Sequence, residues 1–200
     1  ALGVHPSEVE GLTEDDMAWI SSHAAHEKVA AIGEIGLDYH WPEPKPALQK
    51  QWFRRQIELA KEVKLPIIVH SRDAAEPTMQ IIQETKAYEC GGVIHCYSYS
   101  PEMAEEYVKM GFFIGMGGVL TFKNAKKLVR CAERIPLSSI VLETDCPYMA
   151  PEPNRGKRND SSQLIYVAQK LAEIKGITAE EVKQVTTENA HRLYRLTQNK

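Results

Sequence analysis

The sequence predicts an α/β protein with a parallel sheet: a (β/α)8 TIM-type barrel, N-terminally truncated to about six parallel strands. Short apolar runs alternate with longer helical patterns along almost the whole chain. Several of these runs are nearly continuous in hydrophobic residues, which is typical of strands covered on both faces. Such alternation favours parallel strands joined by right-handed crossovers.

The individual elements follow from local signals. We expect strands at 1–4, 28–35, 66–70, 92–96, 112–116 and 139–144. We expect helices near 14–25, 47–63, 76–87, 101–110, 123–134, 161–175 and 179–195. Thr13 is a candidate N-cap followed by acidic residues, and Ser100 is a candidate N-cap followed by Pro101 at the first helical position. A proline-rich polar loop at 147–160 separates the last strand from the last two helices.

Two architectures fit this order, a doubly wound open sheet and a barrel. No G-x-G-x-x-G motif follows the first strand, and no Walker-type loop occurs in the sequence. A barrel of eight strands would need two further βα units, and the chain opens directly on the apolar stretch ALGVHP. We therefore expect a single domain over 1–200 that lacks the N-terminal part of its barrel.

Composition restricts the class of protein. The chain is 43% hydrophobic and 26% charged, as is usual for a soluble globular protein. Its formal net charge of −3 gives no global positive field for binding nucleic acid, although a local basic patch remains possible. The four cysteines form no C-x-x-C pair, which favours a reduced, cytoplasmic compartment. No apolar run approaches the roughly 18–20 residues of a membrane span, so no membrane association is expected.

Metal-competent side chains recur near the ends of the predicted strands. In barrels and open α/β sheets, functional groups gather where the strands end. Three histidines lie at or just past a strand end, one glutamate lies near the end of another strand, and one aspartate directly follows the last. These residues are His5, His70, His95, Glu34 and Asp145.

Each residue also has a simpler interpretation when taken alone. His5 and Asp145 could be turn or cap residues, and His70 and His95 could be hydrogen-bonded core histidines. Glu34 could pair with Arg72 or another base. These interpretations do not predict that all five share one edge of the sheet.

Imidazoles and carboxylates at one edge suit Zn²⁺, Mn²⁺ or a mixed binuclear site. Glu34 interrupts an apolar strand between Gly33 and Gly36. A carboxylate there could bridge two ions, and the glycines would let the backbone approach those ions closely. Two metals about 3.5–4 Å apart can activate a water and stabilise a displacement at phosphorus.

A basic loop supplies a candidate substrate contact. Arg155, Lys157 and Arg158 lie in the loop after the last strand, where they could anchor phosphate oxygens or simply be solvated. Arg72, two residues past His70, could reach the same phosphate or form a salt bridge.

Six segments carry a family resemblance. The sequence resembles the TatD family of metal-dependent deoxyribonucleases at GVHP (3–6), GEIGLDYHW (33–41), PIIVHSRDA (66–74), GVIHCYS (92–98), LETDCPYMAP (142–151) and RGKRND (155–160). The segment TTENAHRLY (186–194) resembles the family's closing helix. The motifs occur in the family's order over nearly the whole chain. Family members commonly begin with a strand carrying an H-x-H pair, and this sequence contains no such pair.

The resemblance implies an amidohydrolase-like barrel with two divalent metal ions, Mg²⁺, Mn²⁺ or Zn²⁺. Glu34 would bridge the metals, His70 and His95 would ligate one of them, and Asp145 would ligate the other and orient the attacking water. Glu34 and Asp145 are thus the implied catalytic residues. His5 would contact substrate, and the basic loop would bind phosphate.

The implied function is hydrolysis of phosphodiester bonds in DNA, exonucleolytically, on single strands or strand ends. One alternative is an amide, ester or lactone hydrolase on the same barrel. Related barrels often bridge their metals with a carboxylated lysine, and a glutamate at the corresponding place favours the nuclease. A second alternative is an inactive or purely binding fragment.

Overall fold

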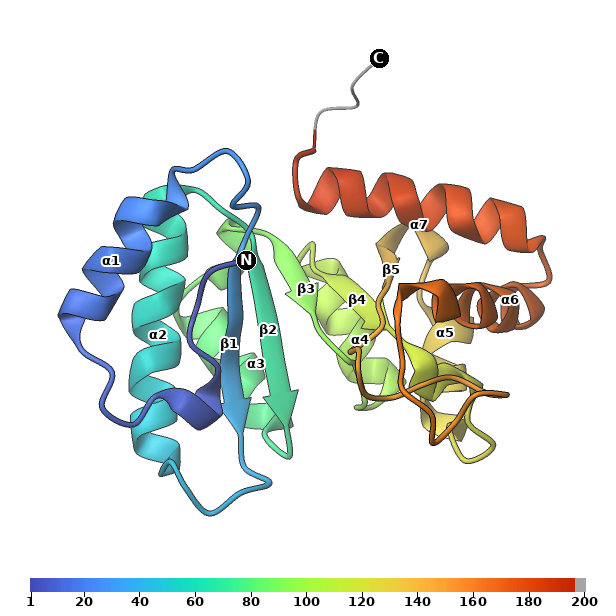
Figure 1. Cartoon of the computed structure of the whole chain (residues 1–200), viewed down its shortest axis with the longest axis horizontal. Helices are drawn as coiled ribbons and strands as arrows, with labels where there is room; N and C mark the ends of the chain where they lie inside the picture. Colours follow the sequence, from blue (N-terminus) through green and yellow to red (C-terminus); the bar gives the residue numbers. More distant parts are fainter. Residues whose placement is uncertain (197–200) are drawn as a thin grey trace. The chain divides into compact units, whose positions relative to one another are not determined.

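Helices and parallel strands alternate along the chain in the computed structural model, which describes residues 1–196. The described residues divide into two units, Ala1–His95 with Leu193–Leu196, and Cys96–Arg192. Both units contain parallel strands and helices, so the predicted α/β class is confirmed (Figure 1).

The first unit is built on three parallel strands, β1 (Ile32–Asp38), β2 (Ile67–Arg72) and β3 (Gly92–Ile94), in that spatial order. β2 pairs with both of its neighbours. The register places Gly36 opposite His70 and Asp38 opposite Arg72. This register brings the carboxyl ends of β1 and β2 level with each other.

Three α-helices belong to the first unit: α1 (Glu14–Ala24), α2 (Pro46–Val63) and α3 (Ala75–Glu84). Thr13 is the expected N-cap of α1, and it forms a capping box with Asp16. Proline at the first position of α2 has no N–H to leave unbonded there. Figure 1 shows α2 running alongside β1, and the two elements are in contact.

The core of the first unit lies between α2 and the sheet. Side chains of α2 at i, i+3, i+4 and i+7 intervals are buried, which is the pattern of a helix with one apolar face. Phe53 and Ile57 on α2, and Ile35 and Leu37 on β1, are all at most 1% exposed. This packing fixes β1 firmly against α2.

The second unit pairs β4 (Phe113–Met116) with β5 (Ile140–Leu142), also in parallel. Its helices are α4 (Pro101–Lys109), α5 (Lys126–Arg134), α6 (Leu164–Lys175) and α7 (Ala179–Leu193). Buried Asn189 on α7 donates hydrogen bonds to the carbonyl oxygens of Leu137 and Ile140. The closing helix thereby holds the start of β5.

Three sequence expectations about strands are wrong. Residues 1–4 form no strand, because only Leu2 makes a parallel bridge, to Ile32. The described residues therefore contain five strands where six were expected. The strand expected at 28–35 runs from Ile32 to Asp38, because Leu37 and Asp38 still pair with β2. Glu34 is accordingly an interior strand residue rather than one near the strand end, and His70, expected at a strand end, likewise lies inside β2 because Ser71 and Arg72 still pair with β1.

No helix among the described residues is long and apolar enough to cross a membrane. The four cysteines, all among the described residues, form no disulfide bond.

Candidate metal centre

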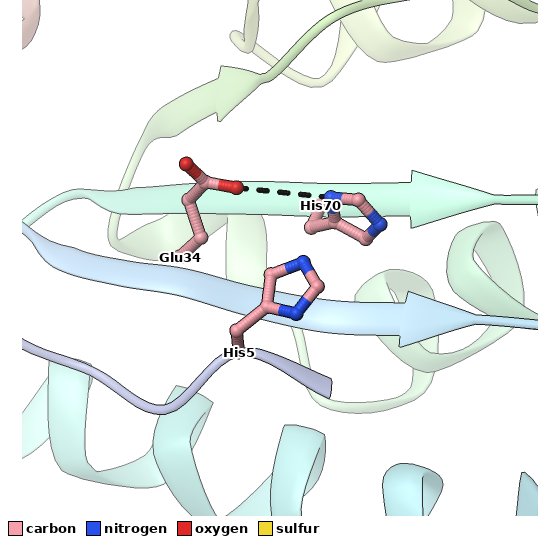
Figure 2. Close-up of side chains that lie close together, drawn as sticks. All are labelled: His5, Glu34 and His70. Atoms are coloured by element: carbon pink, nitrogen blue, oxygen red, sulfur yellow. Dashed lines mark ion pairs between the residues drawn. The ribbon is translucent and has the colours of Figure 1, made fainter. Parts of the chain in front are cut away.

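Three side chains from separate segments of the first unit converge on one point (Figure 2). Glu34 is the third residue of β1, and His70 is the fourth residue of β2. His5 precedes the short helix η1 (Pro6–Glu8). One candidate ligand atom from each of the three residues lies within 4.8 Å of those of the other two.

Glu34 also faces a second histidine. Its Oε2 lies 3.7 Å from His70 Nδ1 and 3.8 Å from His95 Nε2. His95 directly follows β3, and its N–H donates to the Val69 carbonyl oxygen at 2.9 Å, which continues the pairing of β3 with β2. One carboxylate oxygen is thus shared by histidines from two neighbouring strands.

These donors suit a divalent ion. Zinc binds imidazole nitrogen and carboxylate oxygen at about 2.0–2.2 Å, so ligands of one tetrahedral ion lie about 3.4 Å apart. The two distances from the Glu34 oxygen are close to that separation. Nitrogen donors combined with a carboxylate fit zinc or manganese better than they fit magnesium. The residues present therefore fit the metal that the sequence predicts.

Asp38 fixes the orientation of the His70 ring. Its Oδ2 lies 3.0 Å from His70 Nε2, and the residue is only 4% exposed. A carboxylate that accepts from one imidazole nitrogen leaves the other nitrogen as the electron-pair donor. Asp38 thus accepts from Nε2–H and directs Nδ1 toward Glu34.

Sequence reasoning missed Asp38, although a signal was present. Alternate residues of a regular strand point to the same face, and the Glu34 and Asp38 carboxylates do both face the His70 ring. The Gly36 position between them has φ +149°, and a Cβ there would lie 1.9 Å from the His70 carbonyl oxygen. Only glycine permits β1 and β2 to approach closely at this point.

Electrostatics keep the cluster in a metal-binding form. The neighbouring His70 imidazole lowers the pKa of Glu34, and this effect outweighs the opposing effect of burial. Burial lowers the pKa of His5, and the neighbouring charge of His70 lowers it further. At neutral pH the Glu34 carboxylate is therefore ionised and the His5 imidazole is neutral.

Arg72, predicted as a possible partner of Glu34, does not pair with it. Arg72 is the last residue of β2 and is exposed. Among the residues that the structure describes, the ion pairs of Glu34 are those with the two histidines. The Arg72 side chain is thus available for another contact.

Asp145 belongs to the second unit, three residues past β5. It has a left-handed φ of 56°, and its carbonyl oxygen accepts from the Tyr148 N–H at 2.9 Å. Buried Asn159 donates to the carbonyl oxygens of Thr144 and Tyr148, each at 2.7 Å. These bonds hold the turn that presents Asp145.

The three predicted phosphate anchors Arg155, Lys157 and Arg158 are all exposed. The Arg155 guanidinium lies 4.2 Å from the centre of the Phe122 ring, in a cation–π contact. Lys157 Nζ lies 3.4 Å from Asn154 Oδ1. Asn159, at the end of the same motif, is instead a structural residue, which its sequence position did not reveal.

Glu143 is a second carboxylate that the sequence analysis passed over. It follows β5, and its Oε1 accepts from the Cys96 N–H at 2.6 Å. A Cβ on Gly115 would lie 2.4 Å from Glu143 Oε2, so the glycine makes room for this side chain. Glu143 thus ties β5 to the segment that follows His95 in the sequence.

The family assignment comes from comparison with known proteins. Residues 1–195 match the profile of the family described as TatD related DNase. YabD of Bacillus subtilis, named as a metal-dependent hydrolase, is 51% identical over 98% of this chain and 77% of its own length. The mouse protein TATDN3, named as a proposed deoxyribonuclease, is 34% identical over 96% of this chain and 68% of its own length.

A solved structure confirms the fold. The crystal structure of YjjV, a TatD homologue from Escherichia coli, aligns with a TM-score of 0.91 at 32% identity. The alignment covers 98% of this chain and 76% of that one. With the profile match and these relatives, the chain belongs to the TatD family of metal-dependent hydrolases.

Proposed function

We propose that this hydrolase acts as a deoxyribonuclease, cleaving phosphodiester bonds at the ends of DNA strands or in single-stranded DNA. The observation that carries the proposal is the single Glu34 oxygen facing both His70 Nδ1 and His95 Nε2. Three donors this close would hold one divalent ion, and the other carboxylate oxygen of Glu34 would be left to contact a second ion. The family description and the name of the mouse relative support DNA as the substrate.

The proposed cofactor is a pair of divalent ions, Mg²⁺, Mn²⁺ or Zn²⁺. Glu34, His70, His95 and Asp145 would hold them. When bound, such ions lower the pKa of water and neutralise charge on the phosphate. Asp38 would keep the His70 ring in its binding orientation through the bond to Nε2.

The remaining residues would bind and orient the substrate. Asp145 would orient the attacking water and accept its proton on a carboxylate oxygen. His5, neutral beside the cluster, would contact the substrate. The exposed cations Arg72, Arg155, Lys157 and Arg158 would bind phosphate oxygens. Cysteines without a disulfide among the described residues are consistent with action in the cytoplasm, which is part of the proposal.

The first test compares Glu34→Ala with Glu58→Ala. Glu58 is an exposed carboxylate on α2 and is the matched control. Both variants and the wild type are incubated with end-labelled single-stranded DNA, and separately with simple esters and amides. Each reaction contains Mg²⁺, Mn²⁺, Zn²⁺ or chelator. We expect metal-dependent DNA cleavage that falls in Glu34→Ala to the level of the chelator reaction, because the variant lacks a metal ligand, and that persists in Glu58→Ala.

Other outcomes distinguish the alternatives. Turnover of esters or amides without DNA cleavage would identify a different hydrolase on the same fold. Metal binding without turnover of any substrate would identify a binding fragment. DNA cleavage that survives chelator would contradict the proposal outright.

A further inference from the structure

Two glutamines on α2 are buried although both are polar. Gln49 is 1% exposed and Gln56 is 0% exposed. They are seven residues apart, so they lie on the same face of the helix two turns from each other. Buried amides are normally hydrogen-bonded. Each of these two side chains bonds to both the N–H and the carbonyl oxygen of a single residue.

Gln56 forms two hydrogen bonds with the backbone of Val4. Its Oε1 accepts from the Val4 N–H at 2.7 Å, and its Nε2 donates to the Val4 carbonyl oxygen at 3.1 Å. The two bonds reproduce the pairing that a neighbouring strand would supply. Val4 immediately precedes His5, whose Nδ1 lies 2.7 Å from Ser7 Oγ. Gln56 therefore fixes the segment from which His5 projects.

Gln49 forms the same pair of hydrogen bonds with the backbone of Asp38. Its Oε1 accepts from the Asp38 N–H at 2.8 Å, and its Nε2 donates to the Asp38 carbonyl oxygen at 2.8 Å. Gln49 Nε2 also donates to the Pro44 carbonyl oxygen at 2.7 Å. Asp38 is the last residue of β1, and its side chain accepts from His70 Nε2. Gln49 therefore acts on His70 through a single intermediate residue.

We propose that Gln49 and Gln56 are positioning residues with separate tasks: Gln49 sets metal affinity through Asp38 and His70, and Gln56 sets substrate affinity through His5. An uncharged amide offers a donor and an acceptor in one plane, which is what a single residue's N–H and C=O require. Glutamate lacks the donor and methionine lacks both groups. The inference rests on the proposed function, because it takes His70 as a metal ligand and His5 as a substrate contact.

The test uses Gln49→Met and Gln56→Met, which keep side-chain length but lose the hydrogen bonds. Gln51→Met, at an exposed position of the same helix, is the matched control. Metal affinity is measured by calorimetric titration of metal-free protein with Mn²⁺ or Zn²⁺, and KM and kcat on single-stranded DNA are measured with saturating metal. ¹⁵N spectra of the histidine rings report their environment independently of activity.

The expected results differ between the two variants. Gln49→Met weakens metal binding by about 10–100-fold, the usual cost of losing a partner behind a metal-ligating histidine. Gln56→Met keeps metal affinity within about twofold, shifts the His5 ring resonances and raises KM about tenfold, as for one lost hydrogen bond to a charged group. Gln51→Met changes none of these quantities.

Equal losses in both variants would overturn the inference, since a general weakening of the fold would produce them. Unchanged metal affinity in Gln49→Met and unchanged KM in Gln56→Met would also overturn it. If Gln49→Met does not fold, Asp38→Ala tests the same step and is expected to lose the same affinity. An Asp38→Ala protein that retains wild-type affinity would overturn the Gln49 assignment.

His70→Ala separates failure of the inference from failure of the proposed function. If His70→Ala keeps wild-type metal affinity, the proposed metal site itself is wrong. If His70→Ala loses affinity while Gln49→Met and Asp38→Ala keep it, the site stands and only the positioning role fails.

Discussion

Glu34 places a carboxylate in the interior of β1, where its strand neighbours up to Leu37 are apolar. Its neighbours explain this arrangement, because His70 and His95 face the same carboxylate oxygen from the two following strands. The neighbouring His70 imidazole lowers the pKa of Glu34 and keeps it charged. The residue is therefore stabilised as an anion before any ion binds, which reduces the cost of forming the metal site.

The titration of His5 predicts how the free energy of unfolding depends on pH. Its pKa is lowered in the folded state by burial and then by His70, whereas in the unfolded chain it protonates near pH 6.5. The unfolded state therefore binds a proton that the folded state does not as pH falls below about 6.5. Stability from this group is fully present above that pH and is lost progressively below it.

Urea unfolding of metal-free protein between about pH 7.5 and 5.5 measures this effect. We expect the free energy of unfolding to fall more in the wild type than in His5→Gln over that interval. The other histidines are common to both proteins and cancel in the comparison. An equal fall in the two proteins would show that His5 is not the residue responsible.

At the scale of elements, the site depends on how β1 and β2 approach each other. The strands meet with Gly36 opposite His70, so the backbone that carries His70 lies against a position without a side chain. α2 then holds the end of β1 through Gln49. The geometry of the histidine is thus built from one strand pair and one helix.

Gly36→Ala tests that approach. The new Cβ would lie 1.9 Å from the His70 carbonyl oxygen, so β1 and β2 must separate. We expect a loss of about 1–3 kcal/mol in unfolding free energy, as for overpacking, together with weaker metal binding. Gly91→Ala is the control, because a Cβ there meets nothing within 4 Å and only the positive φ is strained. Denaturant midpoints and metal titrations measure both effects, and an unaltered metal affinity in Gly36→Ala would contradict this account.

The sequence predicted the order of helices and strands, because long apolar and amphipathic patterns determine which segments are buried. It did not predict where β1 ends, since that boundary depends on the pairing of Leu37 and Asp38 with β2. Residues 1–4 read as a strand because they are apolar, but beyond Leu2 a glutamine side chain takes the place of a strand partner.

The candidate site was predictable to a similar extent. Glu34, His70 and His95 could be grouped because each was expected near a strand end, and the structure brings them together although Glu34 and His70 lie inside β1 and β2. The sequence did not reveal Asp38, Gln49 or Asn159. Each acts through the backbone or through a second side chain that only the fold brings near. The placement of Asp145 with the other ligands remains a prediction.

At the scale of the molecule, metal binding is expected to stabilise the fold. A ligand that binds only the folded state at 100 times its Kd contributes about 2.7 kcal/mol. For a chain of 200 residues this corresponds to a rise in Tm of about 5–10 °C.

Thermal unfolding with and without Zn²⁺ or Mn²⁺ measures this shift. We expect the shift in the wild type and in Glu58→Ala, and its loss in Glu34→Ala. A shift of the same size in Glu34→Ala would mean that the ion stabilises the protein from some other place.

The most direct measurement is a crystal structure of the protein grown with Zn²⁺ or Mn²⁺, with anomalous diffraction locating the ions. The account predicts an anomalous peak about 2.0–2.2 Å from Glu34 Oε2, His70 Nδ1 and His95 Nε2. Ordered metal bound elsewhere, with these three side chains left uncoordinated, would contradict it.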